Sequence, residues 1–216
     1  MKMFVKGSAD KVVEYVERLK ESQVKVLVDH RINEFIETGK KSDTEIFKEL
    51  CYCILTANFS AEKSMRIQNA IGDGFITLPE CELTYALRSL GHRFPSSRSR
   101  YIVEARKLKD GIKELIASFS DPYQLRDWIA ENVRGLGLKE ASHFLRNIGF
   151  LDFAILDFHI IDLLVECGVI SRPKTLTRKK YLEIEEMMKQ LASKVRLTLG
   201  ELDLYLWWIK TGKILK

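Results

Sequence analysis

The chain has little cysteine and little proline, four residues of each among 216, and no hydrophobic run long enough to cross a bilayer. No secretory signal is recognisable either, so we expect a cytoplasmic protein in a reducing environment, with no membrane partner. The cysteines show neither the paired short spacing of a zinc site nor a four-cysteine run near the C-terminus, which predicts no metal, no iron–sulfur cluster and no other cofactor. They are Cys51, Cys53, Cys81 and Cys167.

Internal repeats, low-complexity tracts, flexible linkers and β-hairpin patterns are also lacking. Hydrophobic residues make up 46% of the chain, enough to bury a core in one compact unit or two small subdomains. Apolar residues recur at helical spacing, which predicts an all-α fold. Besides the helices described next, we expect helices over residues 9–37, 61–71, 80–90, 96–118, 158–167, 178–197 and 201–211.

Capping residues mark two further helix starts. Ser42 to Glu45 has the pattern of a capping box and precedes an apolar helix that we expect to end near Asn58. Cys51 lies on the apolar stripe of that helix and is expected to pack as a small hydrophobe. Asp121 and Pro122 begin another helix, because aspartate is a preferred cap and proline fits the first helical position.

The segment around residues 128–148 predicts two helices joined by a tight turn. Helical spacing of apolar residues stops at Gly135 and resumes after Lys139. Gly135 and Gly137 allow backbone angles that a side chain would forbid, and they leave N–H groups free at the start of the second helix. Such N–H groups, aided by the helix dipole, bind phosphate well.

Lys139 follows this turn directly, and Asp157 lies 18 residues further on (139 to 157). A lysine in this position also fits a simple phosphate contact. A neutral lysine can instead act as a nucleophile, with a nearby carboxylate stabilising positive charge that develops on a sugar. Asp157 has a second interpretation as the cap of the helix expected over 158–167, and the two roles are compatible.

The net charge is only +5, but basic residues cluster in two places. Both clusters fit the solvated faces of surface helices, and both also fit salt-sensitive contacts with DNA phosphates. One cluster contains Arg93, Arg98, Arg100, Arg106, Lys107 and Lys109, and the other contains Arg172, Lys174, Arg178, Lys179 and Lys180. Lys6, Lys11 and Lys20 are further candidates, facing either solvent or DNA.

Several segments resemble one family of DNA repair enzymes. The residues Gly135 to Lys139 resemble the hairpin of the helix-hairpin-helix DNA glycosylases, and the separation of Lys139 and Asp157 fits the lysine and aspartate of that superfamily. Four segments together resemble the compact archaeal and thermophile class of 8-oxoguanine DNA glycosylase/AP lyase. These are residues 139–147 (KEASHFLRN), 155–157 (ILD), 55–58 (LTAN) and 203–207 (DLYLW).

The resemblance implies two helical subdomains flanking a DNA-binding cleft. Residues 1–60 and 150–216 would form one subdomain, and residues 61–149 the other, with the helix-hairpin-helix near 124–148. Larger relatives carry an additional N-terminal β-domain, for which this chain has no room, and several superfamily members carry an iron–sulfur cluster that its cysteines do not fit. The implied partner is double-stranded DNA containing oxidised guanine, bound by a monomer.

The implied reaction has two stages. The damaged nucleotide is extruded from the duplex, because its sugar carbon is unreachable within the stack. Lys139 then displaces the base and forms a Schiff base, β-elimination cuts the strand, and Asp157 assists. Gly135, Gly137, Asn58 and His159 would contact the DNA, with Asn58 entering the gap left by the flipped nucleotide. Asn58 also fits a turn or capping role, and His159 also fits the edge of the core.

The candidates for base recognition come from separate parts of the chain. Trp207 and Trp208 point about 100° apart on a helix, so only one can border the pocket. The resemblance favours Trp207, with Phe94 as the opposing face and Lys216 reading the base edge together with its terminal carboxylate. His143 is a further candidate. Core packing is the alternative for the aromatic residues, and fraying is the alternative for the tail.

Two other functions fit the same sequence. The same chemistry could act on another oxidised base, since Lys139 and Asp157 do not distinguish the lesions. A non-catalytic hairpin module that binds only the DNA backbone is the second alternative.

Overall fold

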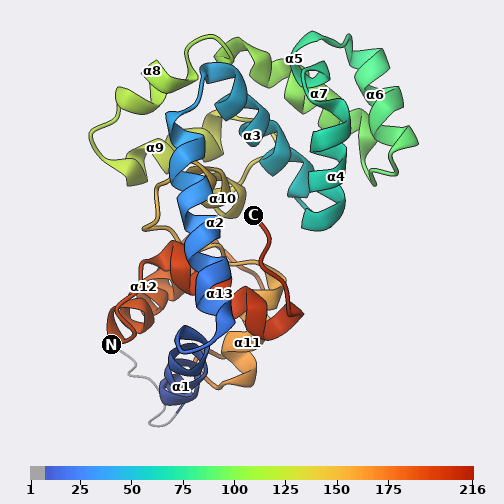
Figure 1. Ribbon diagram of the computed structural model, residues 1–216. Coiled ribbons are helices and arrows are strands. Elements are labelled where there is room, and N and C mark those ends of the chain that lie inside the picture. Colours follow the sequence, from blue (N-terminus) through green and yellow to red (C-terminus); the bar gives the residue numbers. More distant parts are fainter. Residues whose placement is uncertain (1–7) are drawn as a thin grey trace. The chain divides into compact units, whose positions relative to one another are not determined.

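The computed structural model of the chain describes residues 8–216 (Figure 1). Within that range it contains thirteen α-helices and a short 3-10 helix, with no strand, so the predicted all-α fold is confirmed. No helix of the described range is long and apolar enough to cross a membrane. Lys6, a candidate for DNA contact, lies outside the described residues.

The chain divides into two compact units. The terminal unit comprises the residues up to Glu34 together with Phe150–Lys216, and the middle unit comprises Phe35–Gly149. Residues 35–60 thus pack with the middle of the chain, whereas the sequence had suggested a boundary at residue 60. The physical reason is the helix over residues 43–56, which is the centre of the middle unit's core.

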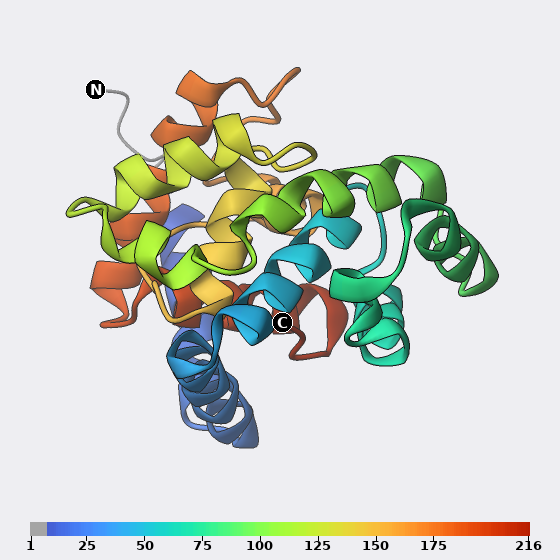
Figure 2. The ribbon, with the colours of Figure 1, turned by 90° about the horizontal axis from the view of Figure 1, so that it is seen from above.

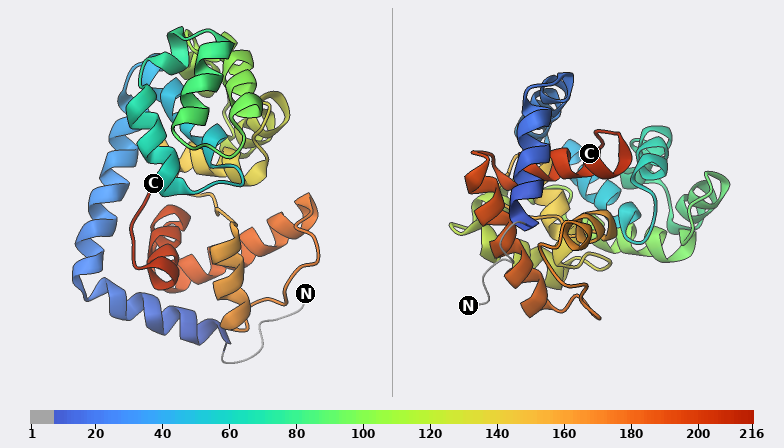
Figure 3. Two further views of the ribbon diagram at one scale, coloured as in Figure 1. Left: turned by 90° about the vertical axis from the view of Figure 1, so that its right-hand side faces the viewer. Right: turned by 90° about the horizontal axis from the view of Figure 1, so that it is seen from below.

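The terminal unit contains five helices, of which the second continues past Glu34 into the middle unit. Val12 and Val16 of the first helix and Leu202 and Leu206 of the last are buried in its core. Figure 3 shows α11 and α13 of this unit packed side by side. The helices are α1 (Ser8–Lys20), α2 (Gln23–Lys40), α11 (Phe158–Glu166), α12 (Arg178–Lys194) and α13 (Leu199–Thr211).

The middle unit contains the remaining helices, seen from above in Figure 2. Here α6 packs against α7, and α10 packs against both α9 and α3. The helices are α3 (Asp43–Thr56), α4 (Ala61–Ile71), α5 (Gly74–Thr77), α6 (Glu80–Ser89), α7 (Pro95–Ala105), η1 (Arg106–Leu108), α8 (Ile112–Ala117), α9 (Pro122–Asn132) and α10 (Leu138–Asn147).

Helix α3 is buried on nearly all sides. It contacts α4, α5, α7, α8 and α10, and every residue from Glu49 to Thr56 is buried. The sequence explains this, because the run from Leu50 to Leu55 is apolar all round the helix rather than along one stripe. Cys51 packs there as predicted, and its burial raises the pKa of its thiol well above the usual value.

Two predicted helices are broken in the structure, and both predictions were wrong in the same way. The helix expected over 9–37 is interrupted at Ser22, whose hydroxyl accepts a hydrogen bond from the Val24 N–H at 3.2 Å and so begins α2. The helix expected over 96–118 ends at Ala105, and Gly111 precedes α8. Helix α5 was not expected, because four residues are too few to show a period.

The predicted caps are present. Ser42 accepts from the Glu45 N–H at 3.4 Å, but the Glu45 carboxylate binds Lys48 at 2.6 Å, so only half of the capping box forms. Asp121 accepts from the Tyr123 N–H at 2.9 Å and begins α9, with proline in the first turn.

A buried polar contact joins α10 to α3. The Asn147 side-chain amide donates to Glu49 Oε1 at 2.7 Å, and its oxygen accepts from Arg146 at 2.9 Å. Arg146 also lies over the Phe35 ring, with the guanidinium carbon 4.7 Å from the ring centroid. Because all three polar residues are buried, each bond satisfies a group that water does not reach.

Replacing Asn147 by leucine should therefore lower the free energy of unfolding by about 2–4 kcal/mol, because buried partners lose their hydrogen bonds. Asn132, an exposed residue that donates to the Trp128 carbonyl at 2.9 Å, is the matched control. Its replacement by alanine should change stability by less than about 0.5 kcal/mol. Urea unfolding followed by circular dichroism measures both, and equal losses would contradict the structural role of Asn147.

Candidate active site

The hairpin between α9 and α10 is formed by residues 133–137. The Val133 N–H still donates to the Ile129 carbonyl, and the Leu136 N–H donates back to Val133 at 3.2 Å, which closes the turn. Gly135 has φ of +91°, in the region that favours glycine. A Cβ on Gly135 would also lie 2.5 Å from Tyr101 Cδ2 of α7, so both backbone and packing require glycine there.

Lys139 lies in the first turn of α10, at the end of this hairpin. Its ammonium pairs with Glu140 Oε1 at 2.9 Å, and its side chain is 25% exposed. The other oxygen of Glu140 accepts the Gly137 N–H at 3.2 Å. From Ala141 onward the helix is buried up to its end, so only the first turn, which carries the lysine, reaches the surface.

Asn58 lies in the loop between α3 and α4, exposed and in the left-handed region with φ of +56°. It does not cap α4, because Ser60 has that role, accepting from the Lys63 N–H at 3.4 Å. Two buried side chains bond to backbone carbonyls just before Asn58. His92 Nε2 bonds the Leu55 carbonyl at 3.1 Å, and Arg98 donates to the Ala57 carbonyl at 2.5 Å.

Phe94 immediately precedes α7 and is half-buried. Arg93 lies over its ring at 4.9 Å and Arg98 at 5.6 Å, measured from the guanidinium carbon to the centroid. Since Arg98 also holds the Ala57 carbonyl, the loops that carry Asn58 and Phe94 share one buried anchor. The structure thus brings these two predicted site residues to neighbouring loops of the middle unit.

The first basic cluster separates into structural and exposed arginines. Arg98 is buried, and Arg106 donates to the carbonyls of Phe75 at 2.9 Å and Leu78 at 2.6 Å. Arg93 and Arg100 remain exposed on the surface of the middle unit. Only part of the cluster is therefore free to meet a phosphate.

Asp157 begins α11 in the terminal unit. Its Oδ1 accepts the Ile160 N–H at 2.9 Å, which confirms the predicted cap. The extended segment before it is held by α12: the Tyr181 hydroxyl donates to the Ala154 carbonyl at 2.6 Å, and Glu185 accepts the Ala154 N–H at 3.1 Å. These bonds fix the backbone three residues ahead of the carboxylate.

Aromatic rings follow Asp157 directly. The His159 ring lies 3.8 Å from that of Phe158 and meets the Trp207 ring edge-on at 4.7 Å, all distances between centroids. Phe158 is 68% exposed, and His159 and Trp207 are half-buried. The indole N–H of Trp207 is buried and has no hydrogen-bond acceptor in the described part of the chain. The rings of Phe158, His159 and Trp207 therefore form one aromatic group at the start of α11.

The two remaining candidates differ in exposure. Lys216 is half-buried at the end of the segment after α13, which stops at Gly212 with φ of +67°. His143 is buried in α10, where its ring meets Tyr52 of α3 edge-on at 5.6 Å. A packing position of this kind gives no support to the base-recognition role expected for His143.

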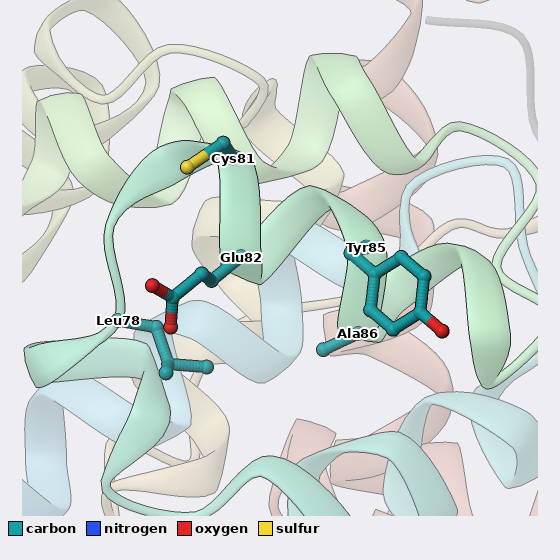
Figure 4. Close-up of a pocket in the computed structure, with 5 residues that line it drawn as sticks. All are labelled: Leu78, Cys81, Glu82, Tyr85 and Ala86. Carbon is teal, nitrogen blue, oxygen red and sulfur yellow. The ribbon is translucent and has the colours of Figure 1, made fainter.

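The described residues contain no group of three or more His, Cys, Asp or Glu side chains that could hold a metal ion. A surface hollow lies beside α6, lined by one residue before the helix and four on it (Figure 4). None of these five belongs to the predicted site. They are Leu78, Cys81, Glu82, Tyr85 and Ala86.

A family model described as 8-oxoguanine DNA glycosylase matches residues 28–197. The chain belongs to this family. It is 51% identical over 208 residues to the 8-oxoguanine DNA glycosylase/AP lyase of Korarchaeum cryptofilum, covering 96% of this chain and 99% of that protein.

Solved structures of the glycosylase family agree. The fold matches the Methanocaldococcus jannaschii 8-oxoguanine glycosylase/lyase in complex with a 15mer DNA containing 8-oxoguanine, with a TM-score of 0.93 at 50% identity, over 95% of this chain and 100% of that one. It also matches the 8-oxoguanine DNA glycosylase of Thermotoga maritima, with a TM-score of 0.90 at 42% identity, over 96% and 100% of the two chains.

The structural roles of three side chains near the predicted site residues were not predicted from the sequence. Glu140 follows Gly137 at the spacing of a helix-capping glutamate, a signal that was present in the sequence. His92 and the anchoring role of Arg98 gave no such signal, because their partners are backbone carbonyls 37 and 41 residues away.

His92 provides a pH prediction. Its Nδ1 accepts the Phe94 N–H at 3.0 Å, so its Nε2 carries the proton donated to Leu55, and the ring is neutral. Burial lowers the pKa of His92 below its usual value of 6.5. The unfolded chain therefore binds this proton at a higher pH than the folded chain does, and stability should fall as pH drops below about 6.5.

The His92→Gln variant should lose that part of the pH dependence. Melting temperatures of both proteins at pH 7.5 and pH 5.5, measured by calorimetry, give the comparison. The wild type should lose more stability than the variant on acidification, and equal losses would show that His92 does not carry the effect.

Proposed function

We propose that this protein is a bifunctional DNA repair enzyme, an 8-oxoguanine DNA glycosylase and AP lyase. The observation that carries the proposal is Lys139, an accessible amine at the end of a glycine hairpin, on a helix that is otherwise buried. Relatives that match nearly the whole chain have this name, and one solved relative binds DNA containing 8-oxoguanine. The substrate is double-stranded DNA, and we propose that the enzyme acts in the cytoplasm on the nucleoid.

The reaction begins with extrusion of the damaged nucleotide. The neutral Lys139 amine attacks C1′ of the sugar, and the bond to the base breaks, with its electron pair leaving on the base, which takes up a proton. The C1′-bound ammonium loses a proton, its nitrogen lone pair forms the C=N bond as the C1′–O4′ bond breaks, and the ring oxygen takes up a proton, which gives the protonated Schiff base. Loss of a C2′ proton then breaks the C3′–O bond, the 3′ phosphate leaves with the electron pair, and hydrolysis of the Schiff base releases the lysine.

Asp157 is proposed to stabilise the positive charge that develops on the sugar during attack. Its cap bond to Ile160 uses one carboxylate oxygen and orients the group. Lys139 lies in the middle unit and Asp157 in the terminal unit.

The remaining roles are proposed by unit. In the middle unit, the hairpin glycines bind the DNA backbone. Asn58, which is exposed and has a left-handed backbone, fills the gap in the duplex. Phe94 provides one stacking face. In the terminal unit, Trp207 and Lys216 recognise the base, and His159 contacts a phosphate while supporting the indole.

Removing the amine tests the lyase mechanism. A duplex with one 8-oxoguanine opposite cytosine, incubated with the protein and borohydride, should give a covalent adduct with the wild type and none with Lys139→Gln. The affinity for the duplex should change by less than about ten-fold, because the variant loses only one positive charge that could contact a DNA phosphate. Lys210, similarly buried and paired with Glu166 at 2.7 Å, is the matched control, and Lys210→Gln should form the adduct.

Two other outcomes favour the alternatives. An adduct only with a different oxidised base would change the lesion, and binding without any adduct would indicate a backbone-binding module.

Asp157→Asn separates the charge of this residue from its structural role. Asparagine caps helices as well as aspartate does, so α11 should remain intact. The rate of adduct formation should fall by about 100-fold, because transition-state charge loses its counter-charge. Asp121→Asn, which keeps the cap of α9 in the same way, should react at the wild-type rate. Equal rates for Asp157→Asn and the wild type would remove Asp157 from the mechanism.

A further inference from the structure

Glu140 contacts two parts of the proposed site at once. Its Oε2 accepts the Gly137 N–H at 3.2 Å, and its Oε1 pairs with the Lys139 ammonium at 2.9 Å. The Glu140 side chain is only 14% exposed, although the Gly137 N–H that it accepts belongs to an exposed residue. A carboxylate fixed by backbone at one oxygen holds the other oxygen in a defined position.

The surroundings make this carboxylate more than a helix cap. Arg98, on α7, is buried, which lowers the pKa of its guanidinium, while Tyr101 and the charge of Glu140 raise that pKa. Arg98 in turn holds the Ala57 carbonyl beside Asn58. Glu140 thus pairs with Lys139, and its charge also acts on the buried arginine that holds the Ala57 carbonyl.

Lys139 needs such a partner. A lysine side chain is a flexible four-carbon stem with no fixed orientation of its own. Attack on a sugar carbon requires the amine to be held in a defined position relative to that carbon. The packing of α10 fixes the backbone of Lys139 but not its amine, because the Lys139 side chain remains 25% exposed.

We propose that Glu140 is a positioning residue, whose backbone-anchored carboxylate holds the Lys139 amine at the hairpin in the orientation from which it attacks. This assignment rests on the proposed function, with Lys139 as nucleophile. Glu140 itself forms no bond with the substrate.

Glu140→Gln tests the assignment, because a glutamine oxygen can still accept the Gly137 N–H while the amide no longer attracts the ammonium. The first measurement uses the free protein, without DNA. Lysines are methylated with formaldehyde and cyanoborohydride, and the rate at Lys139 is read by peptide mass spectrometry. It should rise by roughly three-fold in Glu140→Gln, as expected when an ion pair that shields an amine is lost. The rate at Lys210, which is 20% exposed and paired with Glu166, should not change.

The second measurement is the rate of borohydride-trapped adduct formation on the 8-oxoguanine duplex in a single turnover, with protein in saturating excess. The rate in Glu140→Gln should fall by about ten-fold, because an amine that is no longer held samples unproductive orientations. Saturation makes this rate independent of DNA affinity.

A purely structural role for Glu140 is excluded by a matched variant. Glu201 has the same capping position in α13, where its Oε2 accepts the Thr198 N–H at 2.7 Å, and no lysine is paired with it there. Glu201→Gln should leave both the Lys139 methylation rate and the adduct rate at the wild-type values.

Unchanged Lys139 methylation in Glu140→Gln would overturn the proposal, and so would faster methylation with an unchanged adduct rate. Failure of the proposed function has a different signature, since the wild type itself would then form no adduct on the 8-oxoguanine duplex.

Discussion

The burial of α10 is the constraint on which the middle unit depends. Every residue from Ala141 to Asn147 is buried, against α9 on one side and α3 on the other, and Asn147 is bonded to Glu49 at 2.7 Å. A helix packed over most of its length is a rigid body. The packing of residues 141–147 therefore also fixes the position of the first turn. The Lys139 side chain can therefore remain partly exposed, at 25%, while its backbone position is set by the core. Packing also explains why Gly135 carries no side chain, since Tyr101 of α7 fills the space beside it.

Polar groups then connect this rigid helix to the loops around it. The buried guanidinium of Arg98 loses solvation, which lowers its pKa, and Tyr101 and the Glu140 charge offset part of that lowering. The guanidinium also donates to the Ala57 carbonyl. His92 is likewise buried and neutral, and it bonds the carbonyl of Leu55. Burying these two side chains costs desolvation, and in return their bonds hold the Leu55 and Ala57 carbonyls just before Asn58. A loop held only by apolar contacts would not have its carbonyls satisfied in this way.

Local patterns predicted the features that depend on local physics. The hairpin, the Asp157 cap, the burial of Cys51 and the all-α class all follow from spacing, capping preference or periodicity, and all are present. The breaks at Ser22 and after Ala105 were missed because apolar residues continue at helical spacing through both positions. The extent of the middle unit was not evident either, since it depends on α3 being surrounded, which only the fold determines. The roles of Arg98 and His92 depend on backbone atoms far away in sequence and have no signature in composition.

Both proposed catalytic groups lie at the start of a helix, and the reasons are complementary. Asp157 is at a cap position, where the unpaired N–H groups and the dipole of α11 stabilise a carboxylate and orient it. Lys139 lies in the first turn of α10, where the same dipole repels a cation. An ammonium there needs a compensating negative charge, and Glu140 in the same turn supplies it at 2.9 Å. The helix start that is favourable for the aspartate is thus unfavourable for the lysine unless a glutamate accompanies it. The pairing of Lys139 with Glu140 follows from where the nucleophile is, before any substrate is considered.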